Sequence, residues 1–180
     1  MSLIILDRDG VINYDSDAFI KSPAEWHPIP GSLEAIARLN QAGYKVVVAS
    51  NQSGIARGLF DLNTLNQIHK KMQDELAQVG GVIETILFCP HAPEDNCDCR
   101  KPRPGLLLKI AQQFNRDLTG VPAVGDSLRD IQAALAVGAR PILVRTGKGL
   151  QALHEGHISN DVLVCDDLAG VVNVLVGENK

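Results

Sequence analysis

The sequence is poor in cysteine, has no long apolar run and carries no broad basic field. Only four of its 180 residues are cysteine, and its formal net charge is −4 at pH 7. No stretch reaches the roughly eighteen apolar residues of a membrane-spanning helix, so we expect no membrane partner. The first residues, MSLIILDRDG, lack the basic start and long apolar run of a signal peptide, which predicts a cytoplasmic protein. An acidic chain without a basic stripe also disfavours nucleic acid as a partner.

Three of the four cysteines nevertheless stand together, in the segment CPHAPEDNCDCRKPR at 89–103. In a reducing compartment, clustered thiols hold a metal more often than they form disulfides. Cys89, His91, Cys97 and Cys99, spaced C-x-H-x5-C-x-C, supply three thiolates and an imidazole, a set typical of structural zinc. Four protein ligands leave no coordination position for water, so we expect a structural Zn²⁺ and a zinc-bound loop. The alternative is a group of reduced thiols without metal.

Short apolar runs alternate with helical patterns along the chain. We expect strands at 3–6, 45–50, 82–88, 121–125, 141–144 and 162–165. We expect helices at 31–43, 62–79, 104–115, 128–139 and 168–177. This alternation predicts an α/β fold, a doubly wound and mostly parallel sheet with helices on both faces. No repeat, linker or large insertion is visible, so residues 1–180 are expected to form a single domain without a large cap.

Polar motifs follow four of the expected strands. They are DRDG after the first strand, SNQSG after the second, RKPRPG after the third and GDSLRD after the fourth. In a parallel sheet these strand ends meet at one edge, where ligands bind. The edge would then hold Asp7, Asp9, Ser50, Lys101 and Asp126. Carboxylates crowded together call for a hard cation such as Mg²⁺, and the whole set suits phosphoryl transfer.

These motifs, in this order, resemble those of the haloacid dehalogenase superfamily of phosphatases, whose fold is Rossmann-like. The resemblance implies that Asp7 is the nucleophile and that Asp9 is the general acid and then the general base. It implies that Asp7 and Asp126 bind Mg²⁺ by their side chains and that Asp9 binds it by its backbone carbonyl. It further implies that Ser50 and Lys101 stabilise the phosphoryl group.

Within the superfamily, DRDGVIN, SNQSGIARG, the zinc loop and VGDSLRD are similar to the heptose 1,7-bisphosphate 7-phosphatases. That resemblance implies removal of the 7-phosphate from D-glycero-D-manno-heptose 1,7-bisphosphate, in the synthesis of heptose precursors for lipopolysaccharide or surface glycans. It also implies a small phosphorylated sugar as the partner, and we expect a monomer. The implied substrate-binding residues are Asp15, Ser16, Asp17, Ala18, Asn51, Gln52, Ser53 and Arg100.

Other functions stay open at this point. Histidinol-phosphate phosphatases share the zinc loop and are the main alternative. A polynucleotide 3′-phosphatase and a non-enzymatic, metal-stabilised binding module are further alternatives, although the intact Asp7, Asp9 and Lys101 argue against the module. Asp130 is compatible with either a helix first-turn acid or a site residue.

Overall fold

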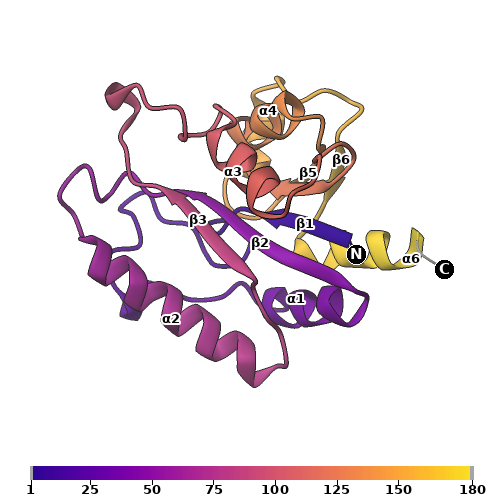
Figure 1. Ribbon diagram of the computed structural model, residues 1–180, viewed down its shortest axis with the longest axis horizontal. Helices are drawn as coiled ribbons and strands as arrows, with labels where there is room; N and C mark the ends of the chain where they lie inside the picture. Colours follow the sequence, from indigo (N-terminus) through magenta and orange to yellow (C-terminus); the bar gives the residue numbers. More distant parts are fainter. Residues whose placement is uncertain (1, 179–180) are drawn as a thin grey trace.

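The computed structural model describes residues 2–178 and contains one six-stranded sheet (Figure 1). The strands are β1 Ser2–Leu6, β2 Tyr44–Asn51, β3 Thr85–Cys89, β4 Pro122–Gly125, β5 Arg140–Val144 and β6 Leu163–Cys165. Their order is β3-β2-β1-β4-β5-β6, and every neighbouring pair is parallel. The central strand β1 places Ile4 beside Val46 of β2 and Ile5 beside Ala123 of β4. The predicted doubly wound α/β fold is confirmed.

Helices cover both faces of the sheet. In Figure 1, α1 Ser32–Gln41 and α2 Leu62–Gln78 lie below the strands, while α3 Gly105–Gln113 and α4 Leu128–Ala136 lie above them. The helix α6 Leu168–Glu178 packs beside α1. Alternate strand residues point to opposite faces. Ile4 therefore joins the apolar cluster with α1, α2 and α6, whereas Ile5 joins the cluster with α3 and α4.

Among the strands, one boundary differs from the expected one by three residues, and the structure contains one additional α-helix. The strand predicted at 82–88 begins only at Thr85, because the side chain of Asn40 engages both backbone groups of Val82. Asn40 donates to the Val82 carbonyl at 3.1 Å and accepts from its N–H at 2.8 Å. The helix α5 Gly149–His154 was not predicted, since six residues are too few to show a helical period.

The segments that cross the carboxyl edge of the sheet are loops with little regular structure. The chain from β1 to α1 contains the 3-10 helix Pro23–Glu25, and the chain from β3 to α3 contains the 3-10 helix Pro93–Asp95. Within residues 2–178, neither segment forms a large cap domain, as expected from the sequence. None of the helices in this range is long and apolar enough to cross a membrane.

Candidate active site

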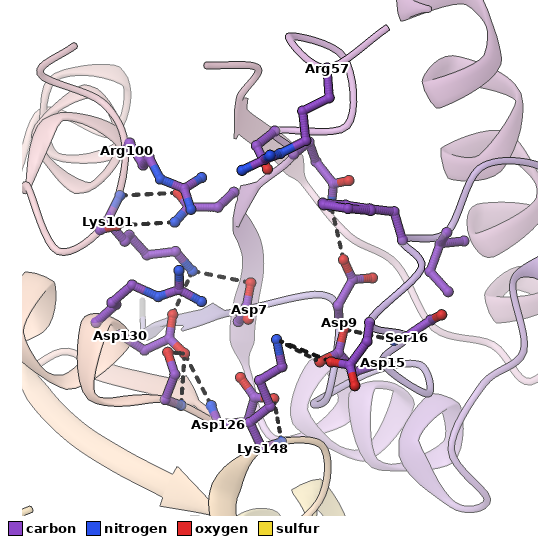
Figure 2. Close-up of a pocket in the computed structure, with 18 residues that line it drawn as sticks. Asp7, Asp9, Asp15, Ser16, Arg57, Arg100, Lys101, Asp126, Asp130 and Lys148 are labelled. Carbon is purple, nitrogen blue, oxygen red and sulfur yellow. Dashed lines mark hydrogen bonds and ion pairs between the residues drawn. The ribbon is translucent and has the colours of Figure 1, made fainter. Parts of the chain in front are cut away.

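A polar pocket of about 220 Å³ lies at the carboxyl edge of the sheet (Figure 2). It gathers residues that are far apart in the sequence, because the ends of β1, β2 and β4 meet there. The lining residues are Asp7, Asp9, Asp15, Ser16, Asp17, Phe19, Ile20, Asn51, Gln52, Ser53, Arg57, Arg100, Lys101, Asp126, Ser127, Arg129, Asp130 and Lys148.

Of the residues expected at the phosphoryl site, all but Ala18 and Ser50 line this pocket. Ala18 is exposed, and its N–H donates to the Ser16 hydroxyl in a tight turn, so that Phe19 rather than Ala18 reaches the pocket. Ser50 is 1% exposed and lies beneath the pocket wall. Its hydroxyl accepts a hydrogen bond from Gln52 at 2.8 Å.

Lys101 is buried, and its ammonium uses all three of its donors. Nζ donates to Asp130 at 2.7 Å, to the carbonyl of Ala49 at 2.7 Å and to Asp7 at 3.1 Å. Burial works against the charged amine, but Asp130 and Asp7 outweigh it and hold the pKa of Lys101 well above its usual value. The cation is therefore fixed beside Asp7.

The backbone of Lys101 is also fixed. The side-chain amide of Asn51, the last residue of β2, donates to the Lys101 carbonyl at 3.1 Å and accepts from the Lys101 N–H at 3.0 Å. This reciprocal pair attaches the end of the cysteine-rich loop to the sheet. Both the backbone and the ammonium of Lys101 are therefore held in place by hydrogen bonds.

Three carboxylates, from Asp7, Asp126 and Asp130, have oxygens within 4.8 Å of one another. Burial raises the pKa of Asp7 to about 7, with the charges of Asp130 and Asp9 adding to the effect and Lys101 opposing it. Burial and the charges of Asp7 and Asp130 raise the pKa of Asp126 to about 8. Such crowding favours a cation bound by these oxygens, because its positive charge offsets the repulsion between the carboxylates. Both oxygens of Asp130 are already bonded, Oδ1 to Lys101 and Oδ2 to Ser127, whereas Lys101 contacts Asp7 only at Oδ1. Asp7 and Asp126 are therefore the side chains best suited to hold Mg²⁺.

Asp9 lies outside that group and is held by donors from three sides. Its Oδ1 accepts from Arg8 Nε and from Asn13, each at 2.9 Å, and its Oδ2 accepts from Gln52 at 3.1 Å. Burial acts to raise the pKa of Asp9, but the charge of Arg8 and these hydrogen bonds outweigh it and lower the pKa below its usual value. The carboxylate of Asp9, two residues after Asp7, is therefore held in one orientation.

The turn after β5 also contributes to the site, and the sequence patterns did not indicate it. The backbone N–H of Lys148 donates to Asp126 Oδ2 at 2.9 Å, and the Thr146 hydroxyl donates to the Gly10 carbonyl at 2.6 Å. Gly147 between them has φ +58°, and an added Cβ there would collide with Asp126 and Gly10. The Lys148 ammonium lies 3.6 Å from Asp15. This turn thus orients a metal-ligand candidate and reaches the loop after β1.

Three guanidinium groups, from Arg57, Arg100 and Arg129, line the same pocket. Burial lowers the pKa of Arg100, and the positive charges of Arg129 and Arg57 lower it further. Among residues 2–178, no carboxylate forms an ion pair with any of them within 4.0 Å. Arg57 stacks over Phe19, with 5.7 Å from its guanidinium carbon to the ring centroid. The pocket is thus acidic around Asp7 and basic on the side of Arg100.

The cysteine-rich loop forms a compact group of donors beside this basic side. The three thiol sulfurs and His91 Nδ1 lie within 4.8 Å of one another, and His91 Nδ1 is 3.4 Å from Cys99 Sγ. Burial acts to raise the pKa of Cys97, but N–H donors, led by that of Arg100, and the neighbouring thiols lower it to about 6. Cys89 is more deeply buried, and its pKa is raised to about 12. This donor set fits tetrahedral Zn²⁺.

The positions of Arg57, Arg129 and Lys148 are findings of the structure rather than of the sequence. Arg57 stands four residues after the SNQS motif, and Arg129 stands directly before the last aspartate of GDSLRD. The spacing of those motifs was a usable signal for both. Lys148 follows β5, whose end carries no recognised motif, so only the parallel topology would have indicated it.

Comparisons with known proteins agree with this geometry. Residues 3–133 match the family model for polynucleotide kinase 3 phosphatase, and residues 98–171 match a HAD-hydrolase-like model. The D-glycero-beta-D-manno-heptose-1,7-bisphosphate 7-phosphatase of Bordetella bronchiseptica is 60% identical over 99% of both chains. The enzyme of the same name from Pseudomonas putida is 54% identical over 98% of this chain and 100% of its own.

A solved structure extends the agreement to three dimensions. The crystal structure of D,D-heptose 1,7-bisphosphate phosphatase from B. bronchiseptica, complexed with magnesium and phosphate, matches with a TM-score of 0.97 over 99% of both chains at 60% identity. A shared fold and 60% identity over almost the whole of both chains are the marks of one protein family. The chain belongs to the D-glycero-beta-D-manno-heptose-1,7-bisphosphate 7-phosphatase family of HAD-like hydrolases.

Proposed function

We propose that the protein removes the 7-phosphate from D-glycero-D-manno-heptose 1,7-bisphosphate and leaves the 1-phosphate. The observation that carries this proposal is the division of charge in one pocket. The acidic side around Asp7 suits a metal-bound phosphoryl group, and the three unpaired arginines suit a second phosphate on the same molecule. A substrate with one phosphate would leave Arg57, Arg100 and Arg129 without a counter-charge. The names of the relatives support the same substrate.

Asp7 is the proposed nucleophile. One of its oxygens forms a bond to phosphorus while the bond from phosphorus to the sugar oxygen breaks, and Asp9 gives a proton to that oxygen. The ionised Asp9 then takes a proton from water as the water oxygen attacks phosphorus. Phosphate leaves and the Asp7 carboxylate is restored. The low pKa of Asp9 applies to the free site; a phosphate placed beside it adds negative charge, which raises the pKa and favours the protonated acid.

Lys101 and Gln52 are proposed to hold the transferring group. The ammonium of Lys101 already lies 3.1 Å from Asp7, so an oxygen of a phosphoryl group bound at Asp7 falls within its reach. Ser50 is proposed to act through Gln52, because its hydroxyl contacts the Gln52 amide. Asn51 supports this arrangement by holding the Lys101 backbone.

Two metals are proposed with separate tasks. Mg²⁺ at Asp7, Asp126 and the Asp9 carbonyl supplies positive charge that offsets the phosphoryl oxygens. Cys89, His91, Cys97 and Cys99 would hold Zn²⁺, which would fix the loop that ends in Arg100. Support comes from the clustering of each donor set, and for magnesium also from the B. bronchiseptica structure.

The protein is further proposed to act in the cytoplasm as a monomer formed by residues 1–180 as one domain, on a small sugar and not on nucleic acid. The net charge of −4 is unfavourable for a phosphate backbone.

One assay separates the candidate substrates. Phosphate release is measured with both anomers of the heptose bisphosphate, with histidinol phosphate and with a 3′-phosphorylated oligonucleotide, using Asp7→Asn as the inactive control. We expect kcat/KM for one bisphosphate anomer to exceed that for the other substrates at least tenfold. A higher value for histidinol phosphate or for the oligonucleotide would overturn the proposal. Arg129→Ala should raise KM for the bisphosphate and leave hydrolysis of a simple aryl phosphate unchanged.

A further inference from the structure

Arg8, between the two site aspartates, is completely buried. Its side chain is 0% exposed, and its guanidinium forms an ion pair with Asp9. Nε donates to Asp9 Oδ1 at 2.9 Å, while Nη2 lies 2.9 Å from the same oxygen without forming an aligned hydrogen bond. A buried guanidinium is costly unless its N–H groups are bound, and since Nη2 has no hydrogen-bond partner, a partner for Nη1 matters all the more.

That partner is His69, from the middle of α2. His69 Nε2 lies 3.1 Å from Arg8 Nη1, and the imidazole is 7% exposed. Arginine has no acceptor, so the histidine nitrogen must be the acceptor and must carry no proton. Burial, together with the charge of Arg8, lowers the pKa of His69 to about 3, which agrees with a neutral ring. His69 is therefore a neutral imidazole with one fixed tautomer.

We propose that His69 is a positioning residue that holds the Arg8 guanidinium, and through it the Asp9 carboxylate, in the orientation needed for proton transfer. This inference rests on the proposed role of Asp9. No residue of α2 lines the pocket within the described chain, so His69 acts on the site through Arg8 and not by touching a ligand there.

The type of residue at position 69 matters as much as its place. A carboxylate at position 69 would compete with Asp9 for the positive charge of Arg8 and weaken the ion pair between Arg8 and Asp9. A neutral acceptor does not compete in this way. An apolar residue would leave Nη1 unbound, and the guanidinium would then be free to rotate away from Asp9 Oδ1. Asn13 and Gln52 would still contact Asp9, but neither provides a charge.

The test uses leaving groups of different quality on the full-length protein. His69→Leu removes the acceptor at similar size, and His69→Gln returns an acceptor near the position of Nε2. Ile68→Val, at a neighbouring buried position of α2, is the control for loss of packing. For each variant, kcat is measured with an alkyl phosphate, which needs a proton on its leaving oxygen, and with an activated aryl phosphate, which needs little. Mg²⁺ affinity is measured by calorimetry on each variant.

We expect His69→Leu to lower kcat on the alkyl phosphate at least about tenfold and on the aryl phosphate less than about threefold, with Mg²⁺ affinity unchanged. His69→Gln should recover most of the loss, and Ile68→Val should show no difference between the substrates. Equal losses on both substrates, or no recovery with glutamine, would overturn the inference. The wild-type protein provides a measurement independent of folding defects: nitrogen NMR should show His69 neutral at pH 5, and protonation near pH 6.5 would also overturn it.

The proposed function is tested separately by Asp9→Asn. If that variant loses activity equally on both phosphates while the chemical step limits both rates, Asp9 is not the acid and the proposed mechanism fails. If Asp9→Asn shows the difference and His69→Leu does not, only the inference about His69 fails. In the Asp9→Asn background, His69→Leu should cause no further difference between the two substrates, because the group that it positions is gone.

Discussion

The ammonium of Lys101 lies 2.7 Å from Asp130, and both side chains are almost wholly buried, at 5% and 8% exposure. Asp130 does more than pair with the lysine. Its Oδ2 accepts from the N–H groups of Asp126 and Ser127, each at 3.1 Å, and from the Ser127 hydroxyl at 2.8 Å. One carboxylate therefore fixes the start of α4, the loop that carries Asp126, and the cation beside Asp7.

Asp130→Asn should consequently lower stability and activity together. The amide keeps some contacts but loses the charge opposite Lys101, and loss of one partner of a buried ion pair costs about 3 kcal/mol. Chemical denaturation should show this decrease, and kcat should fall at least tenfold. Arg145 pairs with Asp166 on the surface at 2.7 Å, so Asp166→Asn is the matched control. It should change the free energy of unfolding by less than about 1 kcal/mol. Similar losses in both variants would contradict this reading of Asp130.

Gly147→Ala should weaken Mg²⁺ binding. The new Cβ would collide with Asp126 and Gly10, and the residue would keep an unfavourable φ of +58°. Gly156→Ala is the control, since its φ of +74° carries the same strain, roughly 1 kcal/mol, with no atom within 4 Å of the new Cβ. Calorimetry should show at least tenfold weaker Mg²⁺ binding for Gly147→Ala and no change for Gly156→Ala. Equal affinities in the two variants would remove the turn after β5 from the metal site.

The stability of the metal-free protein should decrease from pH 6.5 to pH 8. Asp7 and Asp126 have folded-state pKa values of about 7 and about 8, above their ordinary value of 3.8. Each binds its proton more tightly in the folded state, so the stabilisation is complete below pH 4 and is lost as the pH rises through 7 and 8. His69, with a pKa of about 3 against an ordinary 6.5, opposes this trend only below pH 6.5.

Thermal unfolding in the presence of a chelator measures this effect. The melting temperature should fall over this pH range in the wild type and fall less in Asp7→Asn, which has one titrating carboxyl fewer. Added Mg²⁺ should raise the melting temperature more at pH 8 than at pH 6.5, because protons compete with the cation at the lower pH. A melting temperature that rises with pH in the presence of chelator would show that the pKa values of Asp7 and Asp126 are not raised in the folded protein.

Cys97→Ser should reduce the zinc content from one per chain to well below that value. Cys97 has the lowest thiol pKa of the cluster, about 6, and is therefore readily available as a thiolate ligand. Cys165→Ser is the control, because Cys165 is a buried thiol at the end of β6 and lies outside the cluster. Elemental analysis should find full zinc in the control only. The KM for the bisphosphate should rise in Cys97→Ser while Mg²⁺ remains required; unchanged kinetics in a zinc-free variant would exclude a role for the metal.

The sequence was sufficient to predict the sheet and the acidic half of the site, for a physical reason. Parallel strands bring their carboxyl ends to one edge, so Asp7, Asp126 and Lys101 were placed together by topology alone. Contacts made by side chains across loops have no such rule. The Arg8–His69 pair, separated by 61 residues, and the turn at Gly147 depend on packing that periodicity does not encode. Asp130 shows the intermediate case, where local pattern predicted its first-turn position but not its partner Lys101.

The reciprocal pair between Asn51 and Lys101 has a consequence for how this family can diversify. The side-chain amide of Asn51 forms the two hydrogen bonds that the backbone of a neighbouring strand would form. Lys101 therefore stays bound to β2 when the length of the chain between Cys89 and Cys99 changes. Residues inserted between His91 and Cys97 would lengthen the loop outward without altering the bonds that hold the lysine. The loop beside the arginines can then change length, and with it the reach over a substrate, while the catalytic centre keeps its geometry.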